Sequence, residues 1–179
     1  MFDILTTVLI VLAVAVVAVL AYAATRPDTF SIQRSASIAA PAERIFPLIA
    51  NLKAMNTWNP FVQPDPAIKI AYSGPEIGKG AAHTWKGNNN VGEGRIEVTE
   101  ATAPGRVAMN LVMIKPMKAD NAVEFTLRPN GTGTNVTWTM SGRQPFLAKL
   151  MTVFIDCDKM VGRQFEQGLA SLKAIAETS

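Results

Sequence analysis

The pattern of apolar and polar positions divides the chain into three parts. Residues 4–24 carry no charged side chain and form one apolar run. Between residues 29 and 141, short segments alternate apolar and polar positions, which is typical of strands with one buried face. Between residues 146 and 177, apolar residues recur at steps of three and four, which predicts one long amphipathic helix. The stripe of that helix consists of Leu150, Val153, Phe154, Cys157, Met160, Val161, Phe165, Leu169, Leu172 and Ile175.

The middle part predicts a first strand, a helical segment and then a series of strands. Ala40-Pro41 suits a helix start, and Pro47 is either tolerated in the helix or splits it into two short helices. Tight turns such as Pro129-Asn130-Gly131-Thr132-Gly133 imply antiparallel neighbours. The predicted strands cover residues 29–39, 68–72, 78–86, 91–99, 106–115, 122–128 and 135–141.

These elements predict an α+β fold. Each strand has one apolar face that needs cover, and the C-terminal helix is the element of the right size to provide it. A curved antiparallel sheet wrapped around a long C-terminal helix follows. Residues 26–179 form this domain, and residues 1–25 precede it as a separate segment.

The apolar N-terminal run is long enough to cross a bilayer as a helix. Only Asp3 precedes it, whereas a signal peptide has Lys or Arg there, so a retained anchor is favoured. Ala21-Tyr22-Ala23 resembles a cleavage site, which leaves an exported or cleaved form open. Arg26 and Arg34 follow the run, and the positive-inside rule then places the domain on the cytoplasmic side.

Charge and composition argue against several classes of function. The formal net charge is +3, and the basic residues are scattered, so nucleic acid is not an expected partner. A weak attraction to anionic lipid headgroups remains compatible with this charge. His83 and Cys157 are the only His and the only Cys, too few for a usual zinc site. We expect neither a metal nor a cofactor, and the chain contains no nucleophile elbow or phosphate loop.

Three passages resemble a known group, the START-like superfamily, also called SRPBCC or the polyketide cyclase/dehydrase and lipid-transport family. Residues 38–46 are similar to its first strand and proline-opened helix, Asn56-Thr57-Trp58-Asn59-Pro60-Phe61 to its aromatic loop, and residues 158–173 to its terminal helix. The resemblance covers about residues 30–177. It implies a helix-grip fold with a deep apolar cavity between sheet and helix, in a family that includes lipid carriers, cyclases and hydrolases.

Such a cavity would be lined by inward strand positions and by the helix stripe. Gly162 and Gly168 in the helix indicate either close packing or room for a ligand. Methionine suits an adaptable apolar pocket, and the chain has eight. The candidate ligand-binding residues are Trp58, Phe61, His83, Trp85, Met109, Met113, Phe125, Trp138, Met140, Phe154 and Phe165.

The sequence leaves the function open between three classes. The first is a membrane-anchored domain that binds a hydrophobic small molecule or lipid, with the membrane contacted through residues 4–24. The second is a cyclase, dehydratase or hydrolase that uses His83 with a nearby carboxylate, because the free pKa of histidine lies near neutrality. The third is a protein-interaction module.

Overall fold

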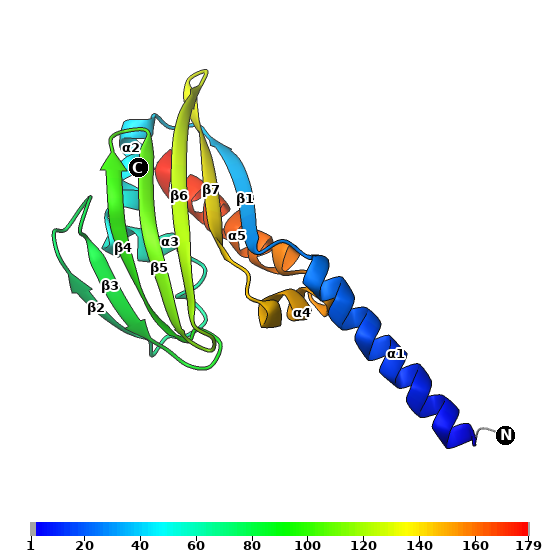
Figure 1. Ribbon diagram of the computed structural model, residues 1–179. Helices are drawn as coiled ribbons and strands as arrows, with labels where there is room; N and C mark the ends of the chain where they lie inside the picture. The colour runs from blue at the N-terminus through cyan, green and yellow to red at the C-terminus, as the bar shows by residue number, and fades with distance from the viewer. Residues whose placement is uncertain (1–2, 179) are drawn as a thin grey trace.

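The computed structural model describes residues 3–178 as a curved sheet that is covered on one face by helices, with one further helix projecting from it (Figure 1). Met1, Phe2 and Ser179 lie outside the described residues, although the expected segments 1–25 and 26–179 include them. The helices are α1 (Ile4–Thr25), α2 (Ala42–Ala50), α3 (Leu52–Trp58), α4 (Phe146–Phe154) and α5 (Cys157–Thr178). The strands are β1 (Thr29–Ile38), β2 (Lys69–Ser73), β3 (Ala82–Lys86), β4 (Glu93–Thr102), β5 (Arg106–Lys115), β6 (Ala119–Asn130) and β7 (Gly133–Arg143).

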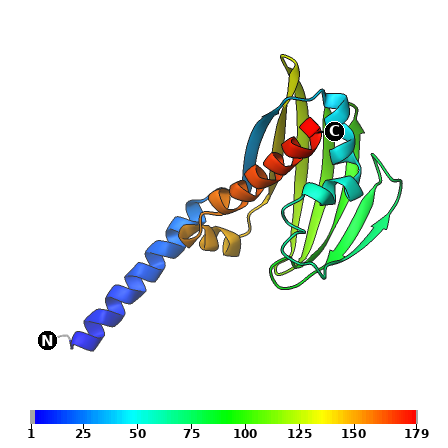
Figure 2. The same cartoon turned by 180° about the vertical axis from the view of Figure 1, so that it is seen from behind.

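The seven strands form one antiparallel sheet in the order β1-β7-β6-β5-β4-β3-β2. This architecture confirms the α+β helix-grip prediction of a curved antiparallel sheet with a long C-terminal helix. Seen from behind, α2, α3 and α5 lie across the concave face (Figure 2). We call this face the inner face.

The register gives the sheet two distinct ends. Thr29 opposes Arg143, so β1 begins where β7 ends, directly after α1 and directly before α4. Met113 opposes Ala119, so the β5–β6 turn lies at the same end. We call this the α1 end of the sheet. The β6–β7 turn, which follows Asn130, lies at the far end.

The helical segment after β1 consists of two short helices, but Pro47 does not separate them, so of the two alternatives for Pro47 the tolerated one is confirmed. Pro47 is tolerated inside α2, and the break comes later, at Asn51. The Asn51 side chain accepts hydrogen bonds from the backbone N–H groups of Lys53 (2.9 Å) and Ala54 (3.2 Å), which caps the start of α3.

The prediction of one continuous helix over residues 146–177 is wrong, because the chain breaks between α4 and α5. Ile155 has an extended backbone. Asp156 then accepts a hydrogen bond from the backbone N–H of Lys159 at 2.9 Å, so it caps a new helix. The break turns the two halves of the predicted stripe in different directions: Phe165 is buried in α5, whereas Phe154 in α4 is 74% exposed.

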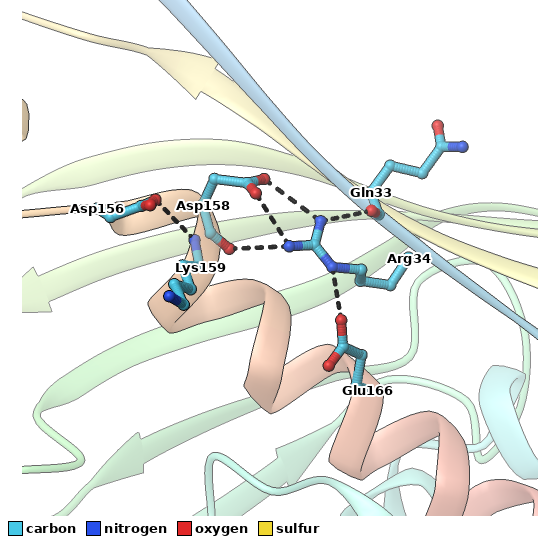
Figure 3. A network of polar contacts seen from close by, with 6 residues as sticks. All are labelled: Gln33, Arg34, Asp156, Asp158, Lys159 and Glu166. Carbon is cyan, nitrogen blue, oxygen red and sulfur yellow. Dashed lines mark hydrogen bonds and ion pairs between the residues drawn. The ribbon is translucent and has the colours of Figure 1, made fainter.

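Both α5 glycines are sites of close packing. A Cβ at Gly168 would lie 2.8 Å from the Trp138 ring and 2.9 Å from Pro60, and a Cβ at Gly162 would overlap the Arg34 guanidinium. Arg34 can therefore cross over the helix. It forms ion pairs with Asp158 and Glu166, both at 2.9 Å, and fastens α5 to β1 (Figure 3).

Helix α1 projects from the domain, and nearly all of its side chains are exposed (Figure 1). Its mean hydropathy over the most apolar window is 3.1, and it fits either a single membrane span or a signal segment. The helix touches the rest of the chain at its C-terminal end, where Ala23 is fully buried.

Candidate functional site

The inner face of the sheet is covered unevenly. Over most of the sheet, its inward-facing side chains are buried under the helices: Val98, Val107, Met109, Phe125, Leu127 and Val136. Toward the α1 end, five inward apolar side chains are only half-buried: Phe30, Trp85, Leu111, Met113 and, one row further in, Met140. Because strand alternation turns these side chains to the inner face, their exposed parts lie on that side. We call these five residues the open end of the inner face.

The cross-strand register joins the open end into a continuous surface. Phe30 opposes Gly142, which opposes Asn121, which in turn opposes Leu111. Met113 opposes Gly94, which opposes Trp85. A Cβ at Gly94 would lie 2.5 Å from the Trp85 ring, so the glycine allows the indole to lie flat against β4.

A cluster of aromatic rings fills the core between the sheet, α3 and α5. Trp138 stacks on Phe165 with 4.1 Å between ring centroids and lies 5.0 Å from Phe125. Trp58 meets Phe125 and Trp138 edge-on, at 6.0 and 5.8 Å. Its indole N–H donates to the Leu48 carbonyl at 2.9 Å, which holds the ring in place. Such edge-on and stacked contacts stabilise a rigid core.

This packing revises the expected deep cavity. A side chain that lines a water-sized cavity has accessible surface inside it. Six of the candidate residues are no more than 3% exposed, and they therefore belong to a close-packed core in this structure. They are Trp58, His83, Met109, Phe125, Trp138 and Phe165.

The remaining candidates are accessible, but not all in one place. Trp85, Met113 and Met140 belong to the open end. Phe61 is 39% exposed and also contacts the core, with ring centroids 6.1 Å from Trp138 and 6.2 Å from Phe165. Phe154 does not join them, because the break before α5 places it on the outer side of α4.

The loop that carries Phe61 is fixed at both ends. Asn59 accepts a hydrogen bond from the Phe61 backbone N–H at 3.1 Å. The buried Asp65 accepts hydrogen bonds from the backbone N–H of Ala67 at 3.0 Å and of Asn88 at 2.6 Å. These bonds hold the loop against the β3–β4 turn, and Phe61 then covers the edge of the aromatic cluster.

His83 is surrounded by aromatic and amide groups. Its ring lies 5.5 Å from that of Tyr72 and 5.8 Å from that of Trp85, and its Nε2 lies 3.4 Å from the Asn56 amide nitrogen. Burial lowers the pKa of His83 to about 4, with a smaller opposing effect from the backbone of Thr84. The side chain is therefore neutral at pH 7.

Three buried polar atoms of the described residues lack a hydrogen-bond partner: His83 Nδ1, Asn121 Oδ1 and Trp138 Nε1. All three belong to inward strand positions, and Asn121 lies between Leu111 and Gly142 at the open end. Buried polar atoms without a partner are uncommon and mark positions where an interior can accept a polar group.

The sequence reasoning missed Asn121, Leu111 and Phe30. Asn121 shares the inward phase of Val123, but the predicted strand began one residue too late to include it. A polar residue in that phase was the signal that could have found it. Leu111 and Phe30 were assigned to the correct strands, but nothing in the sequence shows that the helices leave them partly uncovered.

Two surface hollows lie at the margins of the sheet. One, of about 290 Å³, is bordered by the start of α3, by Tyr72 and by the turn after β2. The other, of about 450 Å³, is shallow and lies beside the β5–β6 turn, where Met113, Ile114 and Lys118 border it. Within residues 3–178, no group of three His, Cys, Asp or Glu side chains is placed to hold a metal ion.

A half-open sheet closed by a C-terminal helix defines the class of protein, a helix-grip domain. Residues 29–177 match the family described as polyketide cyclase / dehydrase and lipid transport. The chain belongs to this family, which agrees with the resemblance found in the sequence. Membership in this family supports the interpretation that the domain binds hydrophobic ligands. No significant match was found among curated protein sequences.

Solved structures show the same fold at low identity. Protein MLL2253 from Mesorhizobium loti aligns with a TM-score of 0.62 and 14% identity, over 84% of this chain and 98% of that one. The Aha1 dimer from Colwellia psychrerythraea aligns at 0.58 and 19%, over 83% and 96%. The major latex-like protein 151 from Panax ginseng aligns at 0.59 and 10%, over 84% and 99%. These similarities establish the fold alone.

Proposed function

We propose that this protein is a membrane-anchored domain that takes up a hydrophobic small molecule or lipid at the open end of the inner face. The observation that carries the proposal is the uneven cover of that face. Apolar side chains that face inward yet remain half-exposed offer a surface that gains free energy when an apolar ligand removes it from water. The family supports the same class of ligand.

The proposed anchor is residues 1–25, and the proposed ligand-binding domain is residues 26–179. The register brings Thr29, the first residue of β1, to the same end of the sheet as Met113. A span through α1 would then hold the open end near the bilayer, where apolar ligands are concentrated. We place the domain on the cytoplasmic side because Arg26 and Arg34 follow the span.

The partnerless polar atoms suggest what kind of ligand fits. Asn121 Oδ1 can accept a hydrogen bond, and it lies in the same cross-strand row as Phe30 and Leu111. The oxygen is buried against Gly142, so the Asn121 side chain would have to turn toward the open end before a ligand with an apolar body and one donor group, such as a hydroxyl, could satisfy it and cover the apolar residues together. We therefore expect amphipathic molecules to bind better than pure hydrocarbons of the same size.

The alternative hypothesis, an enzyme that uses His83 for acid–base catalysis, has less support. The contacts of the ring are Asn56, Tyr72 and Trp85, and within residues 3–178 no carboxylate forms a hydrogen bond or ion pair with it. Burial lowers the pKa of His83 to about 4, so the ring is neither a proton donor nor a strong base at neutral pH.

The proposal is tested with a photoreactive long-chain alcohol that carries a diazirine, added to the full chain in lipid nanodiscs. We expect saturable labelling of open-end residues such as Met113 and Met140, and competition by unlabelled alcohol. Met113→Trp fills the open end and should abolish labelling without a large fall in melting temperature. Ala122→Trp places the same side chain on the exposed outer face and should leave labelling unchanged.

Labelling that does not saturate would contradict the proposal. So would labelling that Met113→Trp and Ala122→Trp reduce equally.

A further inference from the structure

Helix α4 has its apolar and charged side chains in inverted positions. Its large apolar side chains Phe146, Leu147, Met151 and Phe154 are exposed, with Leu147 at 62% and Phe154 at 74%. Its one charged residue, Lys149, is the buried one, at 7% exposure. A helix on the surface of a water-soluble domain normally has the opposite arrangement. The exposed face of α4 is therefore suited to an apolar environment.

Contacts with the end of α1 hold α4 in this orientation. Lys149 forms an ion pair with Asp28, and Arg26 donates a hydrogen bond to the Thr152 carbonyl at 3.0 Å. The Lys149 ammonium, as hydrogen-bond donor and as a charge, keeps the pKa of the Asp28 carboxyl below its usual range. Both views show α4 beside the C-terminal end of α1 (Figures 1 and 2). The polar contacts thus turn the apolar face of α4 outward.

A second exposed apolar group lies at the same end of the sheet. The end of β5 carries Ile114 and the β5–β6 turn carries Met117, and both are about half-exposed. Lys115 lies between these residues and Lys118 follows them, and both lysines are exposed as well. The register places this turn at the α1 end, the end from which the apolar helix departs. Exposed apolar residues flanked by lysines match the boundary between acyl chains and anionic headgroups.

We propose that the exposed face of α4 and the β5–β6 turn lie in the interface of the same membrane that α1 crosses. The inference rests on the proposed anchoring and extends it: the domain is held in one orientation against the bilayer instead of pivoting on its linker. The argument for lipid is continuity, because the polar contacts of Arg26 and Asp28 fix α4 beside the end of the span. The open end of the inner face then lies close to the membrane surface.

The test measures how close single positions come to lipid. The full chain with Cys157→Ser is reconstituted in phosphatidylcholine–phosphatidylglycerol vesicles and labelled with bimane at one introduced cysteine. Leu147→Cys and Phe154→Cys probe α4, and Met117→Cys probes the turn. Thr132→Cys, exposed at the far end, is the matched negative control, and Val16→Cys within α1 is the positive control. Quenching by doxyl-labelled lipid and by aqueous iodide is compared for each position.

We expect Leu147, Phe154 and Met117 to be quenched several-fold more by doxyl lipid than Thr132, and less by iodide. Lipid quenching at Val16 but not at these three positions would overturn the inference and leave the anchor intact. Protection of Leu147 from both quenchers would show a protein partner or a second copy on α4 and would also overturn it. If Val16 itself is not quenched by lipid, the anchoring fails and the inference falls with it.

Discussion

His83 is a buried side chain, and the loss of solvation on burial outweighs the small stabilisation that the Thr84 backbone gives to its charged form. Its Nδ1 has no partner, and its Nε2 meets only an amide nitrogen at 3.4 Å. The environment therefore favours the neutral ring, which fits a structural residue behind Tyr72 better than an acid–base catalyst.

The lowered pKa of His83 predicts a loss of stability in mild acid. The ring has a pKa of about 4 when folded and near 6.5 when unfolded, so the unfolded chain binds the proton more tightly. Its contribution is fully present above pH 6.5 and is lost as the pH falls toward 4. The free energy of unfolding should fall by up to about 3 kcal/mol over this range. Denaturant unfolding from pH 7 to pH 4.5 measures it.

The control for this prediction is His83→Gln, which cannot titrate. Carboxylates such as Asp158, which titrate at lower pH, remain in both proteins. The wild type should therefore lose more stability than the variant between pH 6.5 and 4.5. Parallel curves for the two proteins would show that burial does not shift the His83 pKa as we infer.

At the scale of elements, α5 is held by close contacts on two sides. Gly168 lets Trp138 and Pro60 approach one side, and Gly162 lets Arg34 cross another. The two contacts differ in kind. The Trp138 ring is fixed in the core, whereas the Arg34 guanidinium is the end of a long side chain whose acidic partners are exposed.

This difference predicts that the two glycines tolerate alanine unequally. Gly168→Ala forces a rigid ring to move and should destabilise the domain by about 1–3 kcal/mol, in spite of its better helix propensity. In Gly162→Ala the guanidinium can swing toward solvent, and the lost surface ion pairs contribute little, so stability should change little. Thermal unfolding of the two variants, compared side by side, measures this.

An equal loss for the two variants would mean that Arg34 is as firmly fixed as Trp138. A greater loss for Gly162→Ala would contradict our account of how α5 is packed.

The secondary structure also shows how much of the fold could be predicted from the sequence. Strand alternation placed all seven strands correctly to within a few residues, because every strand except the edge strand β2 has buried residues on one face. The prediction of a single C-terminal helix was wrong at residues 155–156, where the first helix has ended and Asp156 caps a new one. Periodicity alone does not reveal such a break, because the apolar residues of α4 keep helical spacing while they face outward.

The candidate site was harder to predict than the fold. Inward-facing residues such as Phe125 and Met113 have the same place in the strand pattern, yet one is packed and the other half-exposed. The difference depends on where α3, α5 and the Phe61 loop lie over the sheet. That placement is a tertiary property, and no local pattern in the sequence contains it.

At the scale of the whole molecule, the account depends on α1 remaining attached. Its last turn is part of the structure of the domain, since Ala23 is buried and Arg26 donates a hydrogen bond to α4. We therefore expect the full-length chain to stay in the membrane fraction through an alkaline carbonate wash. Mass analysis of the purified protein should show an intact N-terminus, and a mature chain that begins near Ala24 would show cleavage instead.

The side of the membrane is a separate prediction. With the domain on the cytoplasmic side, protease added to intact cells should leave it undigested, whereas protease added to lysed cells should cut it. Digestion in intact cells would contradict the cytoplasmic orientation, and the ligand-binding proposal would stand.

The most direct test of the central claim is native mass spectrometry of the full chain released from its own membrane in mild detergent. We predict a population that carries one extra mass of a single amphipathic molecule per chain, retained in Ala122→Trp and lost in Met113→Trp. Extraction would then identify the molecule. Wild-type protein that appears only at its bare mass, and that also fails to bind an added long-chain alcohol, would contradict the claim that this domain takes up a hydrophobic ligand.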